Sequence, residues 1–141
     1  MISTQSLFER FRTAEETISR GGRDFTLFGL FQRDDLPTKY DVVVSASWLV
    51  RDRSSLSLLI ELVHQAIGDD DWWRRIGKFV VLPQDDPLVQ AVLSLMPGDA
   101  TRHEVKLLHD VPYEDEFIES AAIITAVNPV AEGRMPERVA A

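Results

Sequence analysis

Residues 40–83 read YDVVVSASWLVRDRSSLSLLIELVHQAIGDDDWWRRIGKFVVLP, and this segment predicts two strands with a helix between them. The β-branched run at 42–44 is typical of a strand. Apolar residues recur at helical spacing over 56–67, and the run KFVVL at 78–82 predicts a second buried strand. We therefore expect a right-handed crossover between parallel strands.

Working outward to the N-terminus, residues 7–18 carry apolar side chains at helical spacing, and the glycine pair at 21–22 ends that helix. Residues 25–32 are apolar on both alternating faces, which is typical of a strand covered on both sides. The turn-rich segment RDDLPTK at 33–39 then leads into the strand at 40–45. A hairpin is the simplest way to pair these two strands.

Toward the C-terminus, Asp86 followed by Pro87 predicts a helix start, because the carboxylate accepts hydrogen bonds from free amides and proline has no amide to lose there. Residues 101–109 alternate like a strand, and the apolar run at 118–127 predicts a central strand. The helix that begins at Asp86 should also belong to a right-handed crossover between parallel strands.

The resulting order is α-β-β-α-β-α-β-β, which is an α/β fold of the mixed α+β kind. We expect a mixed sheet of about five strands with helices on both faces. Residues 1–127 should form a single domain, because a chain of this size buries roughly two thirds of its unfolded surface. From residue 128 the segment NPVAEGRMPERVAA has little to bury, so residues 128–141 are predicted to be a C-terminal tail.

The composition excludes several classes of function. The chain has 23 acidic and 15 basic residues, a net charge of −8 and no cysteine. A field of this sign repels phosphate backbones and anionic lipid, so we expect neither a nucleic-acid nor a membrane partner. The absence of cysteine excludes disulfides and thiolate metal sites and fits a reducing compartment. We therefore expect a soluble, cytoplasmic protein without a cofactor.

Polar side chains follow two strands of the predicted crossover. Ser45, Ser47 and Trp48 come at the end of one strand, and Asp85 and Asp86 follow the other. Open α/β sheets bind ligands outside the carboxyl ends of their parallel strands, so these residues predict a site for a small polar ligand. The alternative is structural: the serines are turn residues, Asp86 caps a helix and Trp48 fills the core.

The tripeptide Glu104-Val105-Lys106 resembles the E-x-K half of the motif of the restriction-endonuclease-like nucleases. The resemblance implies a metal-dependent phosphodiesterase, in which Glu104 and a further aspartate, Asp86 or Asp99, bind a divalent cation beside Lys106. A cation held in this way activates water for attack on the phosphodiester. The alternative is that Glu104 and Lys106 belong to the solvated face of an edge strand.

The histidines do not combine into a metal site in the predicted strands. His103 and His109 fall on one face of the strand at 101–109 but about 20 Å apart, at 3.3 Å per residue. His64 lies near the end of its helix and is expected at the margin of the core.

The cluster Trp72, Trp73, Arg74 and Arg75 favours a different function. Tryptophan and arginine are enriched in the hot spots of protein interfaces, and two adjacent tryptophans on a short helix cannot both face inward. The alternative is that a large side chain lies flat beside the core. We interpret the chain as a non-catalytic binding or regulatory module, of the immunity, antitoxin or subunit type, with a protein partner or self-association.

Overall fold

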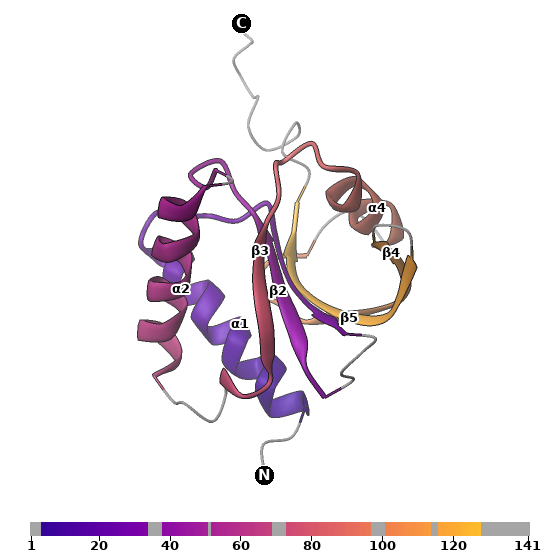
Figure 1. Cartoon of the computed structure of the whole chain (residues 1–141), viewed down its shortest axis with the longest axis horizontal. Helices are drawn as coiled ribbons and strands as arrows, with labels where there is room; N and C mark the ends of the chain where they lie inside the picture. The colour runs from indigo at the N-terminus through magenta and orange to yellow at the C-terminus, as the bar shows by residue number, and fades with distance from the viewer. Residues whose placement is uncertain are drawn as a thin grey trace, which may run out of the picture.

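A computed structural model of the chain contains the predicted crossover at its centre (Figure 1). β2 (Tyr40–Ser45) and β3 (Ile76–Val81) pair in parallel, and α2 (Arg53–Ile67) connects them. The valine run makes β2 a strand that is buried along its whole length. The structure describes residues 4–33, 38–50, 52–68, 73–96, 101–113 and 116–127, so the predicted tail at 128–141 lies outside the described residues.

The sheet has five strands in the order β3-β2-β1-β5-β4, and it is mixed. β1 (Leu27–Gln32) forms the predicted antiparallel hairpin with β2. On its other side β1 pairs with β5 (Glu116–Ala126), which pairs in turn with β4 (Lys106–Tyr113). With α1 (Thr4–Arg20) and α4 (Pro87–Leu95), the order of elements is the one that the sequence predicts.

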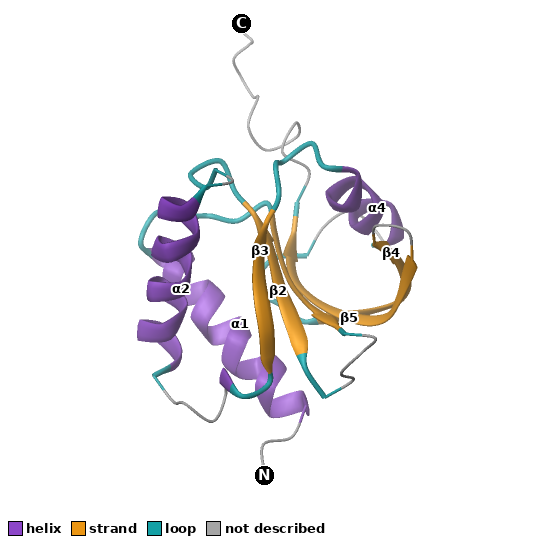
Figure 2. Ribbon diagram, viewed as in Figure 1, coloured by secondary structure: helices purple, strands orange, loops and turns teal. Residues whose placement is uncertain are grey.

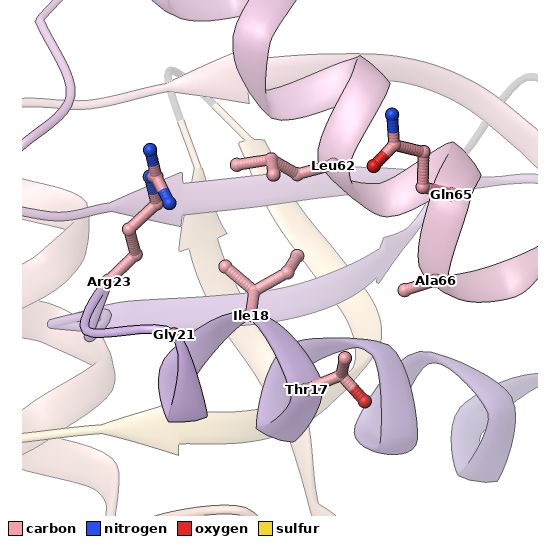
Figure 3. A pocket seen from close by; sticks show the side chains of 7 residues that line it. All are labelled: Thr17, Ile18, Gly21, Arg23, Leu62, Gln65 and Ala66. Carbon is pink, nitrogen blue, oxygen red and sulfur yellow. The ribbon is translucent and has the colours of Figure 1, made fainter.

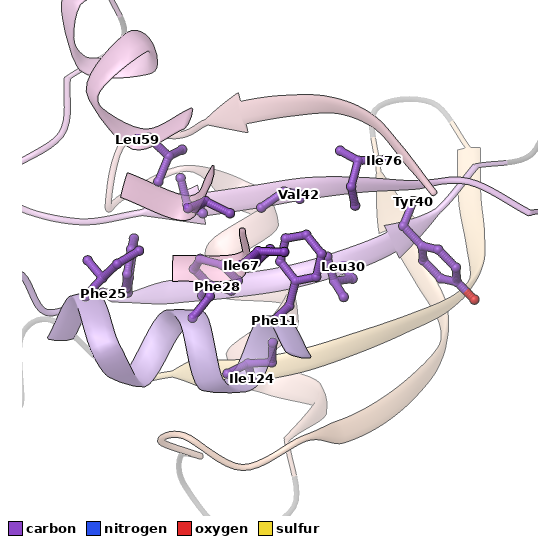
Figure 4. Close-up of a cluster of buried hydrophobic side chains, with 14 of the residues drawn as sticks. Phe11, Phe25, Phe28, Leu30, Tyr40, Val42, Leu59, Ile67, Ile76 and Ile124 are labelled. Carbon is purple, nitrogen blue, oxygen red and sulfur yellow. The ribbon is translucent and has the colours of Figure 1, made fainter. Parts of the chain in front are cut away.

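The helices lie on both faces of the sheet, as expected (Figure 2). α1 and α2 cover one face, where Phe11 of α1 and Leu59 of α2 meet Phe28 and Leu30 of β1 (Figure 4). On the other face Val92 of α4 belongs to a second apolar cluster with residues of β1, β2 and β5. The three central strands are therefore covered on both sides, which explains why β1 is apolar on both alternating faces.

The second crossover was predicted wrongly. β4 does not lie beside β3 but at the far edge of the sheet, and the pairings make the two strands antiparallel. The reason is the hairpin that β4 forms with β5, since only residues 114–115 separate them. Residues 121–127 are all buried, so β5 takes a central place and its hairpin partner takes the edge.

The strands β5 and β4 curl around α4 (Figure 1). The β1–β5 register shifts between Phe28 and Gly29, and a Cβ added at Gly29 would lie 2.9 Å from Ile123 Cδ1. In β4, Asp110 adopts a φ of 57°, which bends the strand. The predicted strand at 101–109 accordingly begins later, at Lys106, with Thr101 in an isolated bridge to β5.

Candidate functional site

The residues predicted at the carboxyl ends of β2 and β3 are divided between the two faces of the sheet. Val42 and Val44 face the α1–α2 core and Val43 the α4 core, so alternation places Ser45 on the α4 side. Ser45 is fully buried, and its Oγ has no hydrogen-bond partner in the described part of the chain. Trp48 packs instead against the α1–α2 core. The structure does not bring these two side chains together.

The other residues of that predicted site have structural contacts or face solvent. Trp48 Nε1 donates to the carbonyl oxygen of Asp24 at 2.8 Å. Asp86 is the N-cap of α4, as predicted, and accepts from the amide of Leu88 at 2.9 Å. Ser47 and Asp85 are exposed. Asp86 thus starts α4 and the indole of Trp48 has a backbone partner, and the ligand site stays a prediction.

The residues of the nuclease-like tripeptide lie at the beginning of β4. Glu104 precedes the strand, and Lys106 Nζ lies 3.4 Å from Glu104 Oε2 in an exposed ion pair. Asp86 is engaged as the cap of α4, and Asp99 lies outside the described residues. Within the described ranges, no group of three His, Cys, Asp or Glu side chains is placed to hold a metal ion. The nuclease function stays a prediction.

Part of the tryptophan–arginine cluster packs against the body of the protein. Trp73 is half-buried between His64, with ring centroids 5.3 Å apart, and Phe79, at 5.6 Å. Its Nε1 is buried and has no acceptor among the residues described. Arg74 is exposed, whereas Trp72 lies outside the described residues. The predicted interface therefore begins at the border between α2 and β3.

Arg75 has a structural role. Its Nε donates to the carbonyl oxygen of Thr38 at 2.6 Å, and Nη2 donates to Thr4 Oγ1 at 3.2 Å. The guanidinium also lies 5.7 Å from the ring centroid of Tyr40. Arg75 thus connects the start of α1 with the start of β2, and these contacts occupy much of its donor capacity.

Sequence reasoning missed a buried polar cluster between α1 and the segment before β4. Glu15 is fully buried and accepts a hydrogen bond from Thr125 Oγ1 at 2.9 Å. Its other carboxylate oxygen lies 2.6 Å from His103 Nδ1. Helical spacing from Phe11 places position 15 on the inner face of α1, and this signal was available in the sequence.

Burial raises the pKa of Glu15, because desolvation disfavours the charged carboxylate. The hydrogen bonds from His103 and Thr125, and then the charges of His103 and Arg102, oppose this shift. His103 itself has a φ of 59° and lies outside β4, contrary to the expected strand position. The cluster ties α1 to β5 and is one of the few buried polar contacts of this core.

A cavity of about 220 Å³ opens between the C-terminal halves of α1 and α2 (Figure 3). Ile18 and Leu62 point toward one another across it, with Arg23 to one side and Gln65 and Ala66 to the other. Three of its seven lining residues have apolar side chains, and Arg23 is the one charged residue among them. No pattern in the sequence indicates this cavity, because it depends on how the two helices pack.

The exposed side of α2 carries few permanent charges for a helix at the molecular surface. Its permanent charges are Arg53 and Glu61, whereas α1 carries six charged residues over a similar length. Leu58 and Ile60 are 39% and 38% exposed. Eight of its 15 residues are apolar: Leu56, Leu58, Leu59, Ile60, Leu62, Val63, Ala66 and Ile67.

No protein-family model matches the chain, and no curated protein or solved structure matches it either. None of the helices in the described ranges is both long and apolar enough to cross a membrane.

Proposed function

We propose that this chain is a non-catalytic protein-binding module, and that it binds through the solvent-facing side of α2. The observation that carries the proposal is the composition of this helix. α2 contacts the body of the protein through one side, and its exposed side carries one permanent charge of each sign together with Leu58 and Ile60, which are 39% and 38% exposed. Two exposed apolar side chains on a helix side with few charges favour an interaction surface.

The partner we propose is a second copy of this chain, packed with its α2 antiparallel to the first. Arg53, Ser57 and Glu61 follow at intervals of four residues and are all exposed, so they form one stripe along the outer face. An antiparallel copy centred on Ser57 places Arg53 of each copy opposite Glu61 of the other. Such an isologous contact satisfies both charges at once.

The side chains around this stripe are suited to helix packing. Ser54 and Ser57 are small, so two helices can approach to about 8–10 Å between their axes. Leu58 and Ile60 flank the stripe on its two sides and would be covered by the contact. The overall charge of −8 opposes self-association, but the face itself is balanced, and salt screens more distant charges over about 8 Å at physiological ionic strength.

Both edges of the sheet carry features that disfavour binding by strand addition. In β3 the pairing register shifts between Tyr40 and Val42 of the neighbouring strand, and Lys78 is exposed. In β4, Asp110 bends the strand and Pro112 has no amide to donate. Bulges, lysine and proline are the usual protection of sheet edges. A side-chain surface is therefore favoured over an edge strand.

The cluster predicted from sequence adjoins the same surface. Trp73 stacks on His64 of α2, and Arg74 follows it in the chain. These residues extend the proposed interface toward β3, while Arg75 stays with its structural contacts. The acidic charge argues against a nucleic-acid partner, and the cysteine-free composition fits a reducing compartment such as the cytoplasm.

Sedimentation velocity over a range of concentrations tests the proposal. The wild-type chain should form a dimer, and Leu58→Glu and Ile60→Glu should each weaken it at least about tenfold, because two carboxylates are then buried in an apolar contact. Leu107→Glu is the matched control, because Leu107 is 59% exposed on β4 and should leave the dimer unchanged. A monomer at all concentrations, or equal loss in the control, would overturn the proposal.

A further inference from the structure

We infer that the cavity between α1 and α2 binds a small monocarboxylate with a compact apolar body, and that Arg23 recognises the carboxylate. This site lies between α2 and α1 and not on the stripe of Arg53, Ser57 and Glu61, although Gln65 of its lining donates a hydrogen bond to Glu61. The cavity lies on the side of α2 that faces α1, between Ile18, Leu62 and Ala66.

Arg23 is an exposed side chain that has no acidic partner among the described residues. It follows Gly22, whose φ of 91° turns the chain at the end of α1. The guanidinium carbon lies 5.8 Å from the ring centroid of Trp48, and the indole is itself fixed by its hydrogen bond to Asp24 O. In the described part of the chain, Arg23 takes part in no hydrogen bond or ion pair.

The other polar groups around the cavity are already engaged. The carboxylate of Asp24, next to Arg23, accepts a hydrogen bond from the hydroxyl of Ser19. Thr17 Oγ1 donates to Thr13 O at 2.8 Å, and Gln65 Nε2 donates to Glu61 Oε2 at 3.1 Å. Arg23 therefore supplies the hydrogen-bond donors for a ligand, while the walls supply apolar contact.

Size and charge define the ligand. Pockets for drug-sized ligands have volumes of roughly 300–1,000 Å³, so 220 Å³ suits a smaller molecule. A guanidinium binds a carboxylate with two parallel hydrogen bonds. One cation on a chain with a net charge of −8 favours a singly charged anion over a phosphate ester or a dicarboxylate. Benzoate has these properties and is the probe we choose.

Amide NMR titrations of the full chain test the site. Benzoate should give saturable shifts centred on Gly21, Leu62 and Ala66. Acetate, which lacks the apolar body, and benzamide, which lacks the charge, should each bind at least about tenfold more weakly. Comparison of these three probes separates specific binding from general attraction of anions to arginines.

Variants of Arg23 complete the test. Arg23→Gln should weaken benzoate at least about tenfold, and Arg23→Lys should fall between it and the wild type, because lysine keeps the charge but loses the planar pair of donors. Arg20→Gln removes the same charge three residues away, outside the cavity, and should leave binding unchanged. Preserved spectral dispersion in each variant shows that it is folded. Shifts spread over the surface, or equal binding by Arg23→Gln, would overturn the inference.

Discussion

Glu15 is a carboxylate on the inner face of α1, where most helices present apolar side chains. Its two hydrogen-bond partners come from the segment before β4 and from β5, so one side chain joins three parts of the chain. Because burial raises the pKa of Glu15 above its ordinary value of 4.5, the folded state holds this proton more tightly than the unfolded state does. Ionised Glu15 therefore costs stability.

The free energy of unfolding should show this cost. Relative to Glu15→Gln, which cannot ionise, the wild-type chain should lose stability as the pH rises through about 4.5 and upward. Urea unfolding of both proteins at a series of pH values measures the difference. If the free energy of unfolding of the wild-type protein instead rises relative to that of the variant as the pH rises, Glu15 acts as a stabilising anion.

Glu16 is the matched control for this experiment, because it is the next residue and its pKa shift has the opposite sign. The charge of Arg20 is the first cause that lowers the pKa of Glu16, and Arg12 adds to it. Compared with Glu16→Gln, the wild-type chain should gain stability as the pH rises toward 4.5. For these two neighbouring glutamates, the difference in the free energy of unfolding between wild type and variant should therefore change with pH in opposite directions.

At this scale the sequence predicted contacts that are local in the chain and missed those that are not. Asp86 as a helix cap needs only Pro87 and Leu88 beside it, and the structure confirms it. His103 and Glu15 lie 88 positions apart, and no local pattern indicates that they meet. Arg23 is similar, because its importance depends on a cavity between two helices that only packing defines.

α2 shows how capping is decided at the level of an element. Serines at 54 and 55 are also good capping residues, but the N-cap is Asp52, whose side chain accepts from the amide of Ser55 at 2.8 Å. Ser55 Oγ accepts in turn from the amide of Val50 at 3.1 Å. A carboxylate followed three residues later by a hydroxyl thus satisfies two free amides at the start of the helix.

Removal of this cap should destabilise the fold by about 1 kcal/mol, the usual effect of replacing a capping aspartate with alanine. Asp52→Ala should accordingly lower the urea concentration at the midpoint of unfolding. Ser54→Ala changes an exposed residue two positions further on and should leave the midpoint nearly unchanged. Equal loss in the two variants, or loss in Ser54→Ala alone, would assign the cap to the serine.

The strands show where prediction from sequence stops. The first crossover and the β1–β2 hairpin were predicted correctly, because each joins neighbours in the sequence through a short connection or one helix. The place of β4 depends on competition among strands for the centre of the sheet. Residues 121–127 are all buried, so β5 lies inside the sheet. The β4–β5 hairpin then places β4 beside β5, at the edge of the sheet.

At the scale of the whole molecule, the proposed function depends on the difference between the net charge of the chain and the charges on the exposed side of α2. The chain is strongly acidic, yet the exposed side of α2 carries one charge of each sign and two exposed apolar side chains. The edges of the sheet are protected, so the helix layer is the surface left for a stable contact. The symmetric dimer that we propose through α2 would cover the apolar residues and pair the charges.

The most direct test of this dimer uses the absence of cysteine in the chain, since a single introduced thiol has no competitor. Ser57→Cys lies at the centre of the proposed contact, where a disulfide can form across the two-fold axis. Ser94→Cys, on the exposed side of α4, is the control. Under mild oxidation, we predict that the Ser57 variant becomes a covalent dimer on a non-reducing gel and that the Ser94 variant stays monomeric. A monomeric Ser57 variant, or equal cross-linking of the two, would contradict the account.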